Sequence, residues 1–246
     1  MKIFYYYHIP KCGGTTISKH LQRLSESSGG RFYNWSINMD RYRTYKKPYY
    51  NFRLRKFIKT LHHPTVPYKF IHHHHGYPGM AEIGDLLLQE KEKAKKMGHE
   101  FFLFTCVRDP LQFIISRVNH MRNVNKMETF TYQNVIKDEI HQNTMFQYYL
   151  RNHFRRLPIK ESTTFDKKDL NKMMNLMDRV FILESFPEPL LWLSKQVDSF
   201  SESLDPSNHK ANVGKHALLP TAEEIDQLRE SNQEDHILYD WAKKHG

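Results

Sequence analysis

Long apolar runs are missing from this 246-residue chain. Without a stretch of about 18 apolar residues, the sequence predicts no membrane-spanning helix. Only two cysteines, Cys12 and Cys106, are present, too few for a disulfide framework, which favours a reducing compartment. The first residues also lack the long apolar segment of a secretory signal peptide. Together these absences favour a globular protein and exclude integral membrane and disulfide-scaffold classes.

Positive charge is abundant and unevenly placed. The chain has 37 Lys+Arg against 27 Asp+Glu, a formal net charge of +10. Between residues 31 and 69 lie ten lysines and arginines and a single acid, Asp40, so this segment alone carries +9, interleaved with aromatic residues. Such a run is either a solvated surface or a surface that binds a polyanion, and charge alone does not separate the two.

Strand and helix patterns alternate along the chain. Short apolar runs predict strands at residues 3–9, 68–72, 101–107 and 180–183. Helical spacing predicts helices at residues 15–24, 80–97, from 110 onward after an Asp109 cap, 131–153, 166–176, 187–197 and 221–244. Alternation of this kind predicts one α/β domain over residues 1–246, a P-loop-like three-layer fold whose central, mostly parallel sheet is flanked by helices.

The turn after the first predicted strand has the features of an anion site. Its sequence, HIPKCGGTT at residues 8–16, contains two glycines, Gly13 and Gly14, that let the backbone approach an anion. Lys11 adds a full positive charge, and Thr15 and Thr16 add hydroxyl donors at a helix N-terminus. The loop is not a Walker A motif, because GxxxxGKS/T is absent. An ordinary strand–helix turn with a surface lysine is the simpler alternative.

This loop resembles the HIPKTGGT signature of carbohydrate sulfotransferases, which use 3′-phosphoadenosine 5′-phosphosulfate (PAPS). A second stretch, FTCVRDP at residues 104–110 with Ser116 following, resembles the same family's 3′-phosphate signature. The resemblance spans most of the chain and is closest to the heparan sulfate 2-O-sulfotransferase branch and its bacterial relatives. It implies that Lys11 and its loop bind the phosphosulfate, while Arg108 and Ser116 bind the 3′-phosphate.

The resemblance also implies a wider cofactor site. Residues 208–219 would fold over the cofactor as a lid, with Lys215 as a phosphate contact. Cys12 stands where the family has threonine; it is either a small residue that fits or a thiol activated by Lys11 and the helix terminus. The complete implied set of cofactor contacts is Lys11, Cys12, Gly13, Gly14, Thr15, Thr16, Arg108, Ser116 and Lys215.

A run of four histidines, residues 72–75, follows the second predicted strand. Sulfuryl transfer needs a base for the acceptor hydroxyl, and histidine suits that role near neutral pH. The family's His-Gly-His pattern falls on this run, which implies His74 as the catalytic base and His72 as its helper, alongside Lys11. A metal site formed by the four histidines, which His62 and His63 could join, is the alternative. It is disfavoured because successive residues of a strand point to opposite faces.

The basic segment at residues 31–69 lies between the two implied catalytic stretches. We expect it to be an insertion on the acceptor side, where arginines bind sulfate or carboxylate groups and tyrosines stack on sugars. The expected acceptor-binding residues are Arg41, Arg43, Lys46, Lys47, Arg53, Arg151 and Arg155.

The sequence therefore predicts a PAPS-dependent O-sulfotransferase that acts on a carbohydrate hydroxyl, with an anionic glycan as acceptor. It requires no metal and releases 3′-phosphoadenosine 5′-phosphate (PAP). The alternatives are a nucleic-acid-binding protein and a nucleotide-dependent kinase. The expected location is the cytoplasm of a bacterial-type cell, or the Golgi lumen if the chain is a trimmed domain. The sequence leaves the acceptor sugar and the oligomeric state open.

Overall fold

The computed structural model describes residues 1–35, 47–74, 79–123, 126–150, 174–198 and 218–245. The strands are β1 (Lys2–Tyr7), β2 (Arg31–Trp35), β3 (Tyr68–His73), β4 (Glu100–Val107) and β5 (Arg179–Ile182). The α-helices are α1 (Gly14–Ser27), α3 (Lys47–Ile58), α4 (Met80–Lys96), α5 (Pro110–Asn123), α6 (Tyr132–Lys137), α7 (Thr144–Leu150), α9 (Glu188–Lys195), α10 (Ala222–Ser231) and α11 (Gln233–His245). Short 3-10 turns are η2 (Glu139–His141) and η4 (Leu183–Ser185). None of the helices in these stretches is long and apolar enough to cross a membrane.

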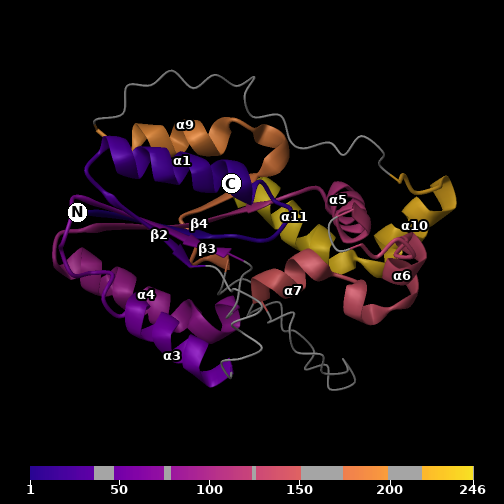
Figure 1. Cartoon of the computed structure of the whole chain (residues 1–246), viewed down its shortest axis with the longest axis horizontal. Helices are drawn as coiled ribbons and strands as arrows, with labels where there is room; N and C mark the ends of the chain where they lie inside the picture. The colour runs from indigo at the N-terminus through magenta and orange to yellow at the C-terminus, as the bar shows by residue number, and fades with distance from the viewer. Residues whose placement is uncertain (36–46, 75–78, 124–125, 151–173, 199–217, 246) are drawn as a thin grey trace.

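The five strands form one sheet in the order β2-β3-β1-β4-β5, and every pair is parallel. Helices α1 and α9 cover one face of the sheet, and α3 and α4 cover the other (Figure 1). Helices α5, α6, α7 and α10 gather beyond one end of the strands (Figure 1). This arrangement confirms the predicted three-layer α/β fold. In such sheets ligands bind beyond the carboxyl ends of the strands, so the loops after β1, β3 and β4 define the region to inspect.

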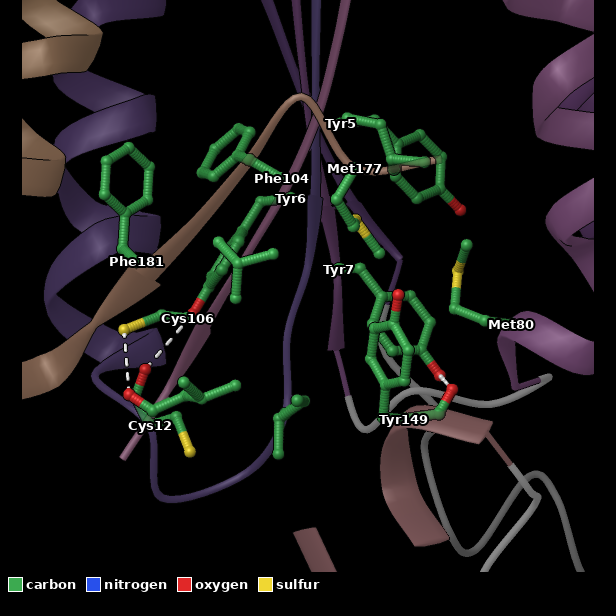
Figure 2. Close-up of a cluster of buried hydrophobic side chains, with 14 of the residues drawn as sticks. Tyr5, Tyr6, Tyr7, Cys12, Met80, Phe104, Cys106, Tyr149, Met177 and Phe181 are labelled. Atoms are coloured by element: carbon green, nitrogen blue, oxygen red, sulfur yellow. Dashed lines mark hydrogen bonds between the residues drawn. The ribbon is translucent and has the colours of Figure 1, made fainter. Parts of the chain in front are cut away.

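The central strand β1 separates two buried layers of side chains. Tyr5, Tyr6 and Tyr7 are all fully buried, although each carries a hydroxyl. Tyr6 points to the same side of the sheet as Phe104, and Tyr5 and Tyr7 point to the other side (Figure 2). The hydroxyl of Tyr7 donates to the carbonyl of Tyr149 at 3.3 Å, which satisfies a buried donor. The run predicted at residues 3–9 thus forms β1, a strand buried on both faces that begins one residue earlier and ends two residues earlier than predicted.

The structure places two elements of the basic segment, residues 31–69, within the fold itself. Strand β2 pairs with β3 at the edge of the sheet, and α3 packs against α4. Lys69, one of the cations of this segment, is buried, and its Nζ donates to the carbonyls of Leu61 at 3.0 Å and His63 at 2.6 Å. Burial, and then the charge of Arg31, lowers the pKa of Lys69. Lys69 therefore holds the turn after α3 and has a structural role.

The helix predicted over residues 131–153 is broken into α6, η2 and α7. The break ends at Asn143, whose φ of 46° is left-handed. From there α7 starts on a buried carboxylate, because Asp235 of α11 accepts the N–H of Phe146 at 2.7 Å and that of Met145 at 3.3 Å. Burial raises the pKa of Asp235 to about 7, although the hydrogen bonds from Phe146 and Met145 favour the charged carboxylate and lower it. The contact joins α7 to α11 and fixes the position of α7 beyond the ends of the strands.

Candidate active site

The loop between β1 and α1 turns through two left-handed residues. Lys11 has a φ of 68°, and Gly13, which precedes α1, has a φ of 76°. This conformation costs a residue with a Cβ about 1–2 kcal/mol, so its presence at Lys11 indicates a loop held in a special shape. No side chain caps α1, and the first amides of a helix have no carbonyl partner within it. The amides of Gly13, Gly14 and Thr15 are therefore placed for an anion at the helix N-terminus.

The side chain of Cys12 points into the core and not to the exposed side of the loop. Its side chain is fully buried, and its Sγ lies 3.9 Å from the sulfur of Met145. Its N–H donates to the carbonyl of Ile9 at 3.3 Å, so the amide is already used within the turn. Burial raises the pKa of the thiol well above its ordinary value, which is the opposite of what a reactive thiolate requires. Cys12 therefore fills the core beneath the loop.

Lys11 and Arg108 lie close together, at the ends of the neighbouring strands β1 and β4. Burial lowers the pKa of Lys11, and the positive charge of Arg108 lowers it further. The Nε of Arg108 is buried and has no hydrogen-bond partner among the described residues. Within the same part of the chain, neither cation forms an ion pair. Two like charges held together, with a buried donor left unsatisfied, favour an anionic ligand between them.

Helix α5 adds polar groups to the same edge. Asp109 caps it as the sequence predicted, accepting the N–H of Gln112 on its Oδ1 at 2.9 Å. Ser116 is partly buried, and His120 follows four residues later on the same helical face. Burial lowers the pKa of His120, and the charge of Lys11 lowers it further, so His120 lies within electrostatic reach of the loop. His120 was not predicted from the sequence, although its spacing of four residues from Ser116 places the two side chains on one helical face.

Glu184 of η4 braces the backbone that carries Arg108. Its carboxylate accepts the N–H of Asp109 at 3.1 Å and the hydroxyl of Tyr239 at 3.5 Å. Burial and the neighbouring Glu184 raise the pKa of Tyr239 to about 12, which keeps its hydroxyl protonated as a donor. Because Asp109 directly follows Arg108, this contact restrains the end of β4. The sequence analysis missed both Glu184 and Tyr239, since no linear pattern joins positions so far apart.

The histidine run divides between the two faces of the sheet. On the α1 side, His74 stacks on His8 with ring centroids 4.7 Å apart and planes inclined by 9°. On the same side, His72 Nε2 lies 3.1 Å from His8 Nδ1. On the opposite side, the Nδ1 of the fully buried His73 lies 3.0 Å from the hydroxyl of Tyr5. The structure therefore brings His72 and His74 together at the carboxyl edge and leaves His73 in the core.

His62 and His63 were the further residues that could have joined this run in a metal site. His62 instead bonds to the buried Glu90, with Nδ1 and Oε2 2.6 Å apart. The ring of His63 contacts that of His62 in the same turn after α3, with ring centroids 4.2 Å apart and planes inclined by 49°. Among the described residues, no group of three or more His, Cys, Asp and Glu side chains is placed to hold a metal ion. His75 lies outside the described residues.

The acceptor residues expected from the sequence are described only in part. Lys47 is the first residue of α3, and Arg53 is exposed on the same helix. Of the expected cofactor contacts on the first turn of α1, Thr15 is exposed and Thr16 is partly exposed. Six of the expected site residues lie outside the described stretches: Arg41, Arg43, Lys46, Arg151, Arg155 and Lys215.

The sequence matches the model of a known protein family. A family model described as the sulfotransferase family matches residues 2–161, well over half of the chain. The matched region includes the loop after β1, the histidines after β3 and the start of α5. A search among curated proteins returned no match.

Proposed function

The chain belongs to the sulfotransferase family, and from this premise we propose that it is a PAPS-dependent O-sulfotransferase whose acceptor is an anionic carbohydrate. The observation that carries the proposal is that Lys11 and Arg108 follow the neighbouring strands β1 and β4 within electrostatic reach of each other, at the same edge of the sheet as His74. The two cations come from adjacent strand ends and have no carboxylate partner in the described part of the chain. Their positions suit a ligand that carries two separate anionic groups.

The residues at this edge fit the nucleotide. The buried, unpartnered Nε of Arg108 is a donor of the kind that a 3′-phosphate would satisfy, with Ser116 as a second donor. The amides of Gly13, Gly14 and Thr15, together with Lys11, would hold the 5′-phosphosulfate. Thr16 and Lys215 complete the proposed contacts. When bound, PAPS supplies the sulfuryl group, whose bond to the 5′-phosphate oxygen breaks as the acceptor oxygen bonds to sulfur.

Side chains of the protein would then accept the proton of the acceptor hydroxyl and offset the charge on the leaving phosphate. His74 would accept the proton of the acceptor hydroxyl, because an imidazole is largely neutral near pH 7 and can act as a base. Lys11 would offset the negative charge that grows on the departing phosphate oxygen. His72, which also contacts Ser18 through its Nδ1 at 3.0 Å, would keep the neighbouring rings in place.

An anionic acceptor is supported by the surface of α3. Its Phe52 is 64% exposed, and the helix carries no acid. Because α3 follows one parallel strand and leads into the next, its first residue, Lys47, lies toward the carboxyl edge and its last turn lies away from it. The exposed cations of α3 and the turn after it are Arg53, Arg55, Lys56 and Lys59. The part of this surface nearer the carboxyl edge suits sulfate or carboxylate groups of a polymer. Arg55, Lys56 and Lys59, at the end of α3 away from that edge and in the turn after it, are expected to lie outside the acceptor site.

The nucleotide site can be tested by thermal shift with PAP and AMP. PAP is expected to raise Tm more than AMP at equal concentration, because only PAP carries the 3′-phosphate. In Arg108→Met this difference should disappear, with a loss of about tenfold or more in PAP affinity, the range for a charge-assisted contact. Arg23→Met, which changes an exposed arginine of α1, is the matched control. Equal shifts by PAP and AMP in the unmodified protein would contradict the nucleotide assignment.

The acceptor assignment can be tested with two triple variants of equal charge change. Arg41→Gln, Arg43→Gln and Lys47→Gln together are expected to raise the acceptor KM several-fold without changing PAP affinity. Arg55→Gln, Lys56→Gln and Lys59→Gln remove the same charge further from the carboxyl edge and should leave KM unchanged, since salt screens exposed charges beyond about 10 Å at 0.1 M. Equal effects of both triples would indicate general attraction, and no effect of either would indicate a solvated surface.

Nucleic-acid binding is the second candidate, because of the +9 segment at residues 31–69. It predicts binding to single-stranded RNA that survives Lys11→Ala and Arg108→Ala and weakens steeply with salt. The proposed sulfotransferase predicts instead that labelled sulfate passes from PAPS to a polysaccharide hydroxyl and that Lys11→Ala abolishes the transfer.

A further inference from the structure

His8, which directly follows β1, is the ring around which the other histidines of the carboxyl edge are arranged. It is buried, with 5% of its surface exposed. One face of its ring stacks on His74 at 4.7 Å, and Tyr6, two residues earlier on the same side of the sheet, stacks at 5.5 Å. Its Nδ1 lies 3.1 Å from His72 Nε2. His8 therefore links the strand end of β1 to both proposed catalytic histidines.

These contacts continue a pattern that runs along the whole α1 side of the sheet. Parallel pairing in register places Phe4 between Phe70 and Phe102, with ring centroids 5.1 Å and 5.2 Å away. Tyr6 lies in the next row, between a ring of β3 and a ring of β4. His8 and His74 form the last row, at the carboxyl edge. The stack of His8 on His74 is thus the end of a column of cross-strand ring pairs, and the rows behind it hold its position.

Gly14 provides the space that His8 occupies. A Cβ built on Gly14 would lie 1.8 Å from His8 Nε2, 2.0 Å from Cε1 and 2.3 Å from Cδ2. The ring thus rests directly against the first residue of α1, where any larger residue would collide with it. The same loop that presents Lys11 is therefore in contact with the ring that stacks on His74.

The hydrogen bonds around His72 limit the charge of this group. His8 Nδ1 and His72 Nε2 face each other, so only one of these two nitrogens can carry a proton at a time. The hydroxyl of Ser18 at His72 Nδ1 can donate or accept and so suits either tautomer. His8 and His72 cannot both be imidazolium in this geometry, and a neutral ring therefore always adjoins His74.

We propose that His8 is a positioning residue for the base: its ring holds the imidazole of His74 by stacking and supports the imidazolium that forms when His74 takes the acceptor's proton. This inference rests on the proposed sulfotransferase function. Stacked rings at this separation attract each other, and an aromatic face stabilises a neighbouring cation. His8 itself neither binds the transferred group nor moves the proton.

Two replacements separate the ring of His8 from its hydrogen bond. His8→Phe keeps an aromatic face for His74 but has no nitrogen for His72. His8→Asn keeps a polar atom near the place of Nδ1 but has no ring. We expect His8→Ala to lower kcat about 10- to 100-fold. Compared with that variant, His8→Phe should restore most of the lost kcat, and His8→Asn should restore little of it. PAP affinity, measured by titration, should stay within about threefold across the series, because the loop amides and Arg108 are unchanged.

The outcomes distinguish this inference from the proposed function. If the unmodified protein transfers no sulfate to any polysaccharide, the proposed function fails before His8 is tested. If it does transfer sulfate, full kcat in His8→Ala, or recovery by Asn and not by Phe, overturns the positioning role. A loss of PAP affinity equal to the loss of kcat would also overturn it, because His8 would then only support the loop.

Discussion

His74→Ala is expected to lower kcat by about 10² to 10⁴, the usual contribution of a positioned general base, with PAP affinity unchanged. The expectation follows from the geometry of the strand end. His74 lies on the α1 side of the sheet, stacked on His8, next to the loop that carries Lys11. The proposed phosphate contacts are Lys11, Arg108 and the loop amides, and His74 is not one of them. Chemistry and nucleotide binding should therefore separate in this variant, measured by turnover and by PAP titration.

His63→Ala is the matched control for that experiment. His63 is an exposed histidine in the turn after α3, and only its backbone carbonyl contacts Lys69. Its replacement should leave kcat unchanged. If His74→Ala retains full activity while His72→Ala loses it, the base is His72 and the assignment to His74 is wrong.

Apolar runs predicted the centre of the sheet because its strands are buried on both faces. β1, β3, β4 and β5 each contain consecutive apolar or aromatic residues, and parallel strands under two helical layers require that pattern. The positions of the two loops that carry Lys11 and Arg108 could be predicted as well, because they come directly after the apolar runs that form β1 and β4. The carboxyl edge as a meeting place for these residues was therefore predictable from fold class alone.

Two elements that the sequence did not reveal are the edge strand β2 and the helix α3, both within the basic segment. β2 has the sequence RFYNW and is only partly buried, so it lacks an apolar run. In α3 the residues Leu54 and Ile58 have helical spacing, but the cations between them dominated the pattern. Charge counts do not distinguish a solvated helix face from a groove. For the same reason Lys69 was counted with the surface cations, although it is buried.

The sequence could predict that His8 and His74 share one face of the sheet, but not that their rings meet, because that depends on the register of the strands. Alternate residues of β1 and β3, ending in His8 and His74, share one face by the period of a strand. Which residues of β1 lie opposite which residues of β3 depends on how the strands pair, and in the structure Tyr6 lies opposite His72. Contacts such as Glu184 with Tyr239 depend on the packing of α11 and have no signature in the linear sequence.

Gly14→Ala is expected to lower kcat about 10- to 100-fold, although local rules favour the change. Gly14 does not have a positive φ, and alanine is about 1 kcal/mol better than glycine inside a helix. The new Cβ would nevertheless lie within 2.3 Å of three atoms of the His8 ring. The ring must leave its place, and His74 then loses the surface on which it stacks. The variant should stay folded, with Tm close to that of the unmodified protein, while turnover falls.

A double-mutant cycle makes the cause testable. In a His8→Ala background the ring is already gone, so Gly14→Ala should cost no further activity, a strongly non-additive result. Gly84→Ala in α4 is the matched control, because the nearest atom to its added Cβ is Leu176 Cδ1 at 3.1 Å, the end of a flexible side chain. That variant should keep its kcat. If Gly14→Ala costs the same activity with and without His8, the glycine acts on the loop amides rather than through the ring, because only a shared contact produces non-additivity between adjacent sites.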